Sequence, residues 1–383
     1  MKYCVIFVVL FFCMTLGGCK NRGNFSDVIT VDLTNHADFV NTSLNEFITD
    51  LKRTRLETND SSLISYFSGY VGDKYIIAVN DDNVILFSSM GEFIRAITTK
   101  GKGPEEFTQI DAWTVNKDET FFLFHDIAKN YICNFNLDSQ QFEENIPFED
   151  HGYLSNMVLI NDTLLSILPG MFSEYGYLFF NQTISGRVTA GFAKENTPHP
   201  GTWAGRSPIF KLSFDNSVVF QPCESDTLYR IDGNNMTPMY SFLVEKPQKN
   251  GDKTTGSSIY YLGSNESRLL FAKSEYESII TPTSSSMNIS GKGYFSFDLR
   301  TEQISEIDHL SFENIDLKLD NAYISFNNKN QIVIAYQAVY FKEMIDEAIK
   351  SEDLAESEKQ RLKKLYGGIS ENHNPIIITG KWK

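Results

Sequence analysis

Short runs of aromatic and β-branched residues, separated by Asp, Asn and Gly, follow one another from about residue 63 onward. Residues 75–79, 84–87 and 93–97 are three such runs, and Asn, Asp and Gly residues lie between them. Asn, Asp and Gly suit the tight turns of a strand meander, because they tolerate positive φ or bond to their own backbone. Related units begin near residues 120, 157, 217, 260 and 322. Six repeats that bury their faces only against neighbours predict an all-β, six-bladed β-propeller spanning residues 28–383.

Two segments interrupt the repeats. Residues 191–208 form an irregular stretch rich in Gly and Pro between the third and fourth units. Residues 341–366 predict a helical hairpin inserted in the last blade. Its first helix would carry an apolar stripe at helical spacing, made by Phe341, Met344, Ile345, Ala348 and Ile349.

A final run at residues 376–379 predicts the strand that closes the ring. We expect it to share a sheet with an early strand, either near residues 29–33 or near residues 55–58. Closure of this kind removes the exposed sheet edges that would otherwise favour aggregation.

The first residues have the pattern of an export signal. Lys2 precedes an apolar run of about 14 residues, which is shorter than a membrane span of ~20 residues. The sequence Leu16-Gly17-Gly18-Cys19 resembles a bacterial lipobox, whose Cys is acylated. We therefore expect a lipoprotein signal peptide at residues 1–18, lipidation at Cys19 and a polar tether at residues 19–27. An ordinary cleaved signal peptide is the alternative.

Composition excludes several function classes. The chain has 34 Lys and Arg against 49 Asp and Glu, giving a net charge of −15, which argues against nucleic acid as a partner. The six His residues show no HxH, HExxH or CxxC-type spacing, so no metal or cofactor is expected. Cys133 and Cys223 are the cysteines left after the leader and Cys19, and they lie in non-adjacent units, so no disulfide is expected.

Several short motifs resemble those of the six-bladed β-propeller lipoproteins of Bacteroidota, an NHL-like family. They are Leu56-Glu57-Thr58, Met90 to Ile94 (MGEFI), Gly101 to Phe107 (GKGPEEF), Ser225 to Arg230 (SDTLYR), Pro238-Met239-Tyr240 and Asn374 to Ile377 (NPII). The resemblance implies the same fold and a place in the cell envelope at the outer membrane. It implies no agreed biochemical activity. From the residues themselves, GKGPEEF reads as a structural turn, because it lacks the GK[ST] ending and following helix of a phosphate loop.

Two functions remain open at this point. The first is a non-enzymatic binding or scaffold protein for a partner protein or a glycan, with no catalytic residue. The alternative is a propeller hydrolase or lyase, lactonase-like or glycan-cleaving, with a site at the channel mouth. The acids available for it follow strand runs, where Asx turns explain them equally well: Asp81, Asp82, Asp126, Asp162 and Asp226.

The loop at residues 191–208 is the predicted ligand site of the binding protein. It contains His199, Trp203 and Arg206, which combine a titratable ring, a flat apolar surface and a forked donor. The alternative is that Trp203 anchors the loop between blades. Exposure of Trp203 distinguishes the two interpretations.

Overall fold

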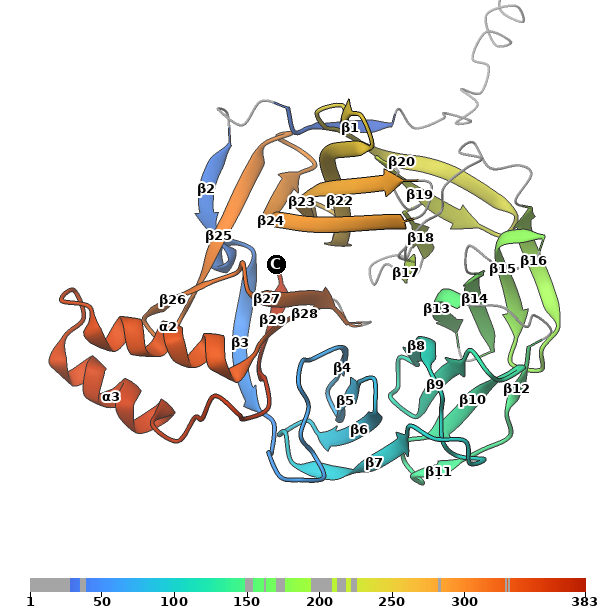
Figure 1. Cartoon of the computed structure of the whole chain (residues 1–383), viewed down its shortest axis with the longest axis horizontal. Helices are drawn as coiled ribbons and strands as arrows, with labels where there is room; N and C mark the ends of the chain where they lie inside the picture. Colours follow the sequence, from blue (N-terminus) through green and yellow to red (C-terminus); the bar gives the residue numbers. More distant parts are fainter. Residues whose placement is uncertain are drawn as a thin grey trace, which may run out of the picture.

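The fold is known from a computed structural model, which describes residues 28–34, 39–148, 154–161, 163–169, 176–193, 209–211, 218–221, 226–281, 284–327, 329 and 331–383. Strands make up 58% of the structure and helices 9%. The described strands form six sheets around a common centre, with the first strand of each repeat on the inside (Figure 1). The chain is therefore an all-β propeller, as its repeats predicted.

Three sheets are built from consecutive strands. The first contains β4 (Gly69–Val71), β5 (Tyr75–Val79), β6 (Asn83–Ser88) and β7 (Phe93–Thr99). The second contains β8 (Ile110–Val115), β9 (Phe121–Asp126), β10 (Tyr131–Asn136) and β11 (Gln141–Phe142), with β12 (Ile146–Pro147) also pairing with β10. The third contains β13 (Leu154–Asn161), β14 (Leu164–Pro169), β15 (Tyr177–Thr183) and β16 (Val188–Ala193).

The other three sheets each add a strand from the N-terminal segment. The fourth contains β17 (Ile209–Lys211), β18 (Val218–Phe220), β19 (Thr227–Asp232), β20 (Asn235–Leu243) and β1 (Ile29–Asp32). The fifth contains β21 (Gln248–Asn250), β22 (Lys253–Ser264), β23 (Arg268–Thr281), β24 (Ser284–Asp298), β25 (Ile304–Phe312), β26 (Ile315–Lys318) and β2 (Val40–Ser43). The sixth contains β27 (Ala322–Phe326), β28 (Gln331–Tyr336), β29 (Ile376–Trp382) and β3 (Ile48–Arg55).

The structure does not have the six blades that the repeats predicted, because its blade count is five. Two of the sheets depart from an even four-stranded meander. In the fourth, the described parts of β17 and β18 are three residues each, whereas β23 and β24 in the fifth reach 14 and 15 residues. Repeat counting on the sequence detects strands but does not detect their unequal lengths.

Alternation along each strand produces the core. In β5, Ile77 packs toward the second sheet, whereas Ile76 and Ala78 pack toward the sixth. Successive side chains of a strand point to opposite faces, so each sheet contributes to two clusters. The described buried residues form six such clusters, one at each junction between neighbouring sheets.

The N-terminal segment lies along the outer rim of three neighbouring sheets. β1 pairs parallel to β20, β2 pairs parallel to β25, and β3 pairs antiparallel to β29. A short 3₁₀ helix, η2 (Leu44–Glu46), joins β2 to β3. The expected ring closure is confirmed for the strand that ends at Arg55, which lies opposite Ile376. The alternative closure through residues 29–33 is wrong, because those residues cover the edge of the fourth sheet.

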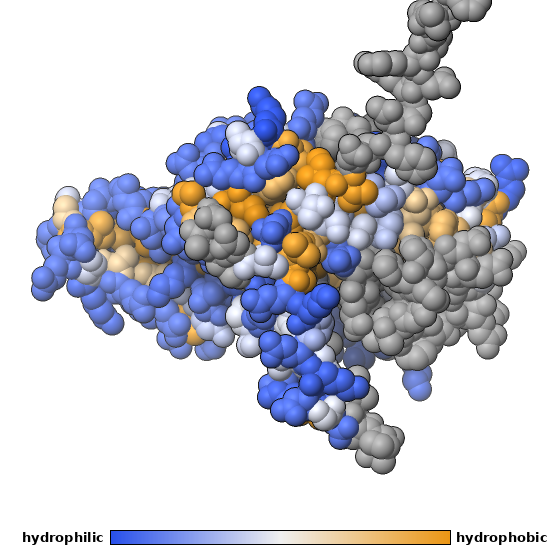
Figure 2. Space-filling view, turned by 90° about the horizontal axis from the view of Figure 1, so that it is seen from above, coloured by the Kyte–Doolittle hydropathy of each residue, from blue (hydrophilic) through white to orange (hydrophobic). Residues whose placement is uncertain are grey.

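Helices α2 (Ala338–Lys350) and α3 (Glu356–Tyr366) lie in the chain between β28 and β29. Phe341 and Ile345 of α2 are buried in the core cluster that joins the fifth and sixth sheets, together with Leu362 and Tyr366 of α3. The pair projects from the rim of the disc with a mainly hydrophilic surface (Figure 2, left). Among the described residues, no helix has the length and the apolar character needed to cross a membrane.

Candidate functional site

The predicted functional residues Cys19, His199, Trp203 and Arg206 lie outside the described residues, as do Cys223 and Asp162. The lipidation site and the ligand-binding loop therefore stay predictions. Cys133 is a buried thiol, and burial raises its pKa to about 11.

Asp126, one of the acids considered for the enzyme alternative, caps a turn. Its carboxylate accepts hydrogen bonds from Thr108 Oγ1 at 2.6 Å and from the backbone N–H groups of Thr108, Gln109 and Ala128. Burial raises the pKa of Asp126, but these hydrogen bonds outweigh burial and lower it. The described residues contain no group of three or more His, Cys, Asp or Glu side chains placed to hold a metal ion.

His125 is paired, although not with its sequence neighbour Asp126. Its Nδ1 lies 2.7 Å from Oδ1 of Asp111, and both side chains are buried. The other oxygen of Asp111 accepts the N–H of Leu154, the first residue of β13, at 2.7 Å. The pair thus joins the second sheet to the third, a contact that the sequence did not indicate.

The GKGPEEF motif forms the structural turn that the sequence predicted. Glu106 folds back so that its carboxylate accepts the N–H of Gly103 at 2.7 Å, and Phe107 is buried in the core. A Cβ on Gly101 would collide with the Glu106 carboxylate. The backbone N–H of Gly103, which a phosphate-binding loop would offer to its ligand, therefore donates to a side chain of the same loop.

Three other motifs meet where the ring closes. Asn374, fully buried, donates to the carbonyls of Glu57 and Ser62 and accepts the N–H of Ile64. Glu57 in turn accepts the N–H of Phe93 at 2.9 Å. The motifs LET, MGEFI and NPII thus form one hydrogen-bonded joint between the chain's two ends. They hold the two ends of the chain together, and Pro375 of NPII also lines the pocket next to this joint.

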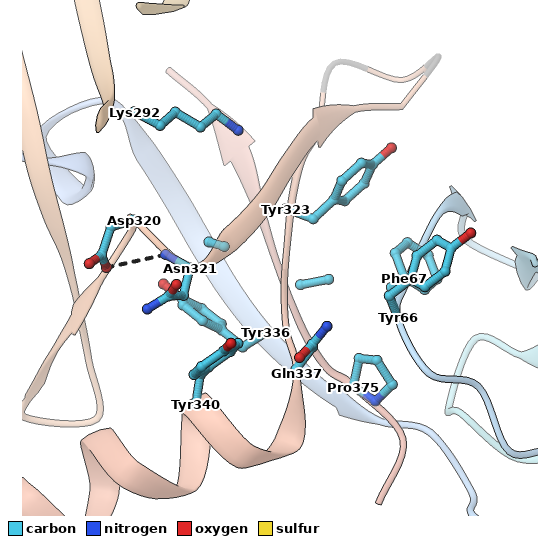
Figure 3. Close-up of a pocket in the computed structure, with 12 residues that line it drawn as sticks. Tyr66, Phe67, Lys292, Asp320, Asn321, Tyr323, Tyr336, Gln337, Tyr340 and Pro375 are labelled. Carbon is cyan, nitrogen blue, oxygen red and sulfur yellow. Dashed lines mark hydrogen bonds between the residues drawn. The ribbon is translucent and has the colours of Figure 1, made fainter. Parts of the chain in front are cut away.

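A pocket of about 330 Å³ lies beside this joint and is rich in tyrosine (Figure 3). We call it the tyrosine pocket, and its principal lining residues are Tyr66, Lys292, Asp320, Asn321, Tyr323, Tyr336, Gln337 and Tyr340. Apart from Lys292 of β24, its residues come from the segment before β4, the beginning of β27 with the residues just before it, the end of β28, and the first turn of α2. In an antiparallel meander these points lie on one side of the sheets, so the pocket opens on one face of the disc.

Three tyrosines at this pocket are solvent-accessible: Tyr66 is 39% exposed, and Tyr323 and Tyr340 are each 37% exposed. Figure 3 shows that they come from three different segments, and the polar side chains of Asn321 and Gln337 line the same pocket. Lys292 lies with its ammonium 4.8 Å from the ring centre of Tyr294, and loss of surrounding water lowers the pKa of Lys292.

Tyr336 is fully buried, and its hydroxyl has no hydrogen-bond partner among the described residues. Burial raises the pKa of Tyr336, and Tyr294 and Asp320 raise it further, so the hydroxyl keeps its proton. The nearby Tyr294 hydroxyl is satisfied, because it donates to the carbonyl of Ala322 at 3.1 Å. Since buried polar groups are normally paired, the Tyr336 hydroxyl points to a missing partner in the pocket.

Sequence reasoning missed this pocket. Tyr66 lies more than 250 residues before Tyr323, Tyr336 and Tyr340 in the chain, and no regular spacing relates the four tyrosines. The one available signal is the position of Tyr66 before β4 and of Tyr323 near the beginning of β27, since loops gather at the ends of strands in a propeller.

The fold and pocket place this chain in the class of β-propellers. By sequence, it matches the domain of unknown function DUF4934 over residues 27–381. The chain belongs to that family.

One solved structure shows the same fold at low sequence identity, and a second is similar more weakly. The "putative exported protein" of Bacteroides fragilis is 15% identical and has a TM-score of 0.60, with 93% of this chain and 99% of that chain covered. A member of the DUF4221 family from Bacteroides vulgatus is 10% identical with a TM-score of 0.46, covering 88% and 97% of the two chains. No curated protein sequence matches the chain significantly.

Proposed function

We propose that this chain is an exported, non-enzymatic binding protein that holds a glycan in the tyrosine pocket. The exposed rings of Tyr66, Tyr323 and Tyr340 around the pocket carry the proposal. The buried Tyr336 hydroxyl has no partner among the described residues, and a ligand oxygen would supply one when the side chains that cover this hydroxyl move. The volume of about 330 Å³ lies at the lower end of the range for small-ligand pockets.

The chemistry around the pocket suits sugars. Exposed tyrosine rings provide flat apolar surfaces for the C–H faces of a sugar ring. The carboxylate of Asp320 and the amides of Asn321 and Gln337 provide acceptors and donors for its hydroxyls. A few polar groups around an aromatic floor are the usual composition of a specific ligand site.

The test is a pair of Tyr→Phe variants. Tyr336→Phe removes a hydroxyl that has no protein partner, so we expect the free energy of unfolding to stay the same or rise while glycan affinity falls about 10-fold. Tyr294→Phe is the matched control, since it removes a hydroxyl bonded to Ala322 and should lower stability by about 1 kcal/mol.

Affinities would be measured by calorimetry on a panel of neutral mono- to hexasaccharides. If no sugar binds, or if Tyr336→Phe binds as tightly as the unchanged chain, the proposal is wrong. Recovery of bound sugars in cleaved form would instead favour the hydrolase or lyase alternative.

We further propose that Cys19 carries lipid and anchors the chain to the outer membrane in the cell envelope. The lipobox-like Leu16-Gly17-Gly18-Cys19 and the exported relative support this. Radiolabelled palmitate should enter the unchanged protein and not the Cys19→Ala variant. Equal labelling of both would contradict the anchor.

We also propose that all six sheets are blades of one NHL-like ring, the two irregular sheets included. Six core clusters, one at each junction between neighbouring sheets, support this count. A crystal structure in which one sheet leaves the ring would contradict it.

A further inference from the structure

A second pocket, of about 270 Å³, lies next to the tyrosine pocket. We call it the polar pocket, and its lining includes Tyr66, Asn80, Asp81, Lys100, Gln109 and Trp113. These residues follow β5 and β7 or lie at the beginning of β8, so they belong to the first and second sheets. The segment before β4 contributes to both pockets.

Tyr66 is the residue that the two pockets share. Its ring lines the tyrosine pocket, whereas its hydroxyl is directed away from that pocket (Figure 3). That hydroxyl donates to Oδ1 of Asp81, in the polar pocket, at 3.4 Å. One exposed side chain therefore separates the two pockets.

The polar pocket also contains an unsatisfied group. The amide nitrogen of Asn80 donates to Asn83 at 3.2 Å, but its buried Oδ1 has no hydrogen-bond partner among the described residues. This atom accepts hydrogen bonds, whereas the Tyr336 hydroxyl in the tyrosine pocket can donate one. A ligand hydroxyl can pair with either atom when the side chains that cover it move, because a hydroxyl both donates and accepts hydrogen bonds.

Trp113 gives the polar pocket an aromatic surface as well. It is half-buried in β8, and its ring packs at 6.4 Å from Phe122 in a tilted arrangement. Each pocket therefore combines aromatic surface, planar polar side chains and one unsatisfied buried polar atom. The two have the same type of chemistry on one face of the disc.

We infer that the two pockets are subsites of one groove that binds a linear oligosaccharide across Tyr66. The inference rests on the proposed function, since it extends the same site. A single sugar ring would occupy the tyrosine pocket alone, whereas a longer chain would reach Asn80, Asp81 and Trp113. Affinity should therefore increase with chain length.

The experiment compares affinities for a mono- to hexasaccharide series of one neutral sugar that binds in the panel. In the unchanged chain we expect the longest members to bind at least 10-fold more tightly than the monosaccharide. Asp81→Ala should weaken binding of the long members about 5- to 10-fold and leave the monosaccharide unchanged.

Asp82→Ala is the matched control, because Asp82 is the exposed neighbour in the same turn and lines neither pocket. Equal affinity for all lengths, with no effect of Asp81→Ala, would overturn the groove and leave the proposed function intact. In that case Tyr336→Phe would still weaken binding. Loss of the Tyr336→Phe effect too would mean that the proposed function itself has failed.

Discussion

Replacing Glu119 by Ala is expected to lower the free energy of unfolding by about 3–5 kcal/mol, the usual cost of breaking a buried, hydrogen-bonded charge pair. Glu119 is fully buried in the β8–β9 turn. Its carboxylate accepts the backbone N–H groups of Asp73, Lys74 and Tyr75 at 2.8 to 3.1 Å. Gly72 leaves room for it, because a Cβ there would collide with the carboxylate.

The same carboxylate also pairs with Lys329. The ammonium of Lys329, from the β27–β28 turn, lies 2.6 Å from Glu119 and 2.8 Å from Asp73. Burial lowers the pKa of Lys329, but its hydrogen bonds with Asp73 and Glu119 outweigh burial and raise it. Glu119 thus connects the first, second and sixth sheets on the face opposite the pockets.

Urea denaturation would measure the effect, and Asp118→Ala is the control. Asp118 is the exposed neighbour, so its replacement should change stability by less than about 0.5 kcal/mol. Residue 119 has a φ of +55°, but Glu and Ala both carry a Cβ, so backbone strain is the same in both. If Glu119→Ala lowers the free energy of unfolding no more than Asp118→Ala does, the contacts of Glu119 with the three sheets do not contribute to stability.

Truncating Leu33 or Leu44 in the N-terminal rim segment should lower stability by about 2–5 kcal/mol each. Both side chains are 1% exposed, and they pack into two different core clusters. Ile29→Ala is the matched control, since Ile29 lies in β1 but is 37% exposed. Thermal or urea unfolding of chains that begin at residue 28 would compare the three variants.

Deleting residues 28–43 should cause association between chains, because the deletion uncovers the outer edges of β20 and β25. Unpaired strand edges template association with other chains. We expect the shortened protein to form oligomers or aggregates in light scattering at concentrations where the full rim segment keeps it monodisperse. A stable, monodisperse shortened protein would show that β1 and β2 are dispensable.

Individual strands were predictable because their signals are local. The run at residues 75–79 is β5 as observed, and residues 93–97 are the greater part of β7. Aromatic and β-branched runs with Asx or Gly turns between them encode strands within ten residues of sequence. Of the two expected ring closures, the one near residue 55 was also correct.

Contacts between distant segments were not predictable in the same way. β1 and β2 pair in parallel with strands more than 200 residues away. Each of these two strands has only four residues, and so short a sequence does not specify which distant strand it pairs with. The pairing of His125 with Asp111, rather than with Asp126, depends on the bulged register between β8 and β9.

The sequence by itself determined that this chain is a repeat-built β-propeller, because strand and turn preferences are properties of neighbouring residues. Only the tertiary structure decided where a ligand could bind. Tyr66, Tyr323 and Tyr336 come together because ring closure brings the first and sixth sheets side by side. Whether a buried hydroxyl has a hydrogen-bond partner depends on how all the surrounding segments pack. That packing cannot be predicted from a local pattern of residues.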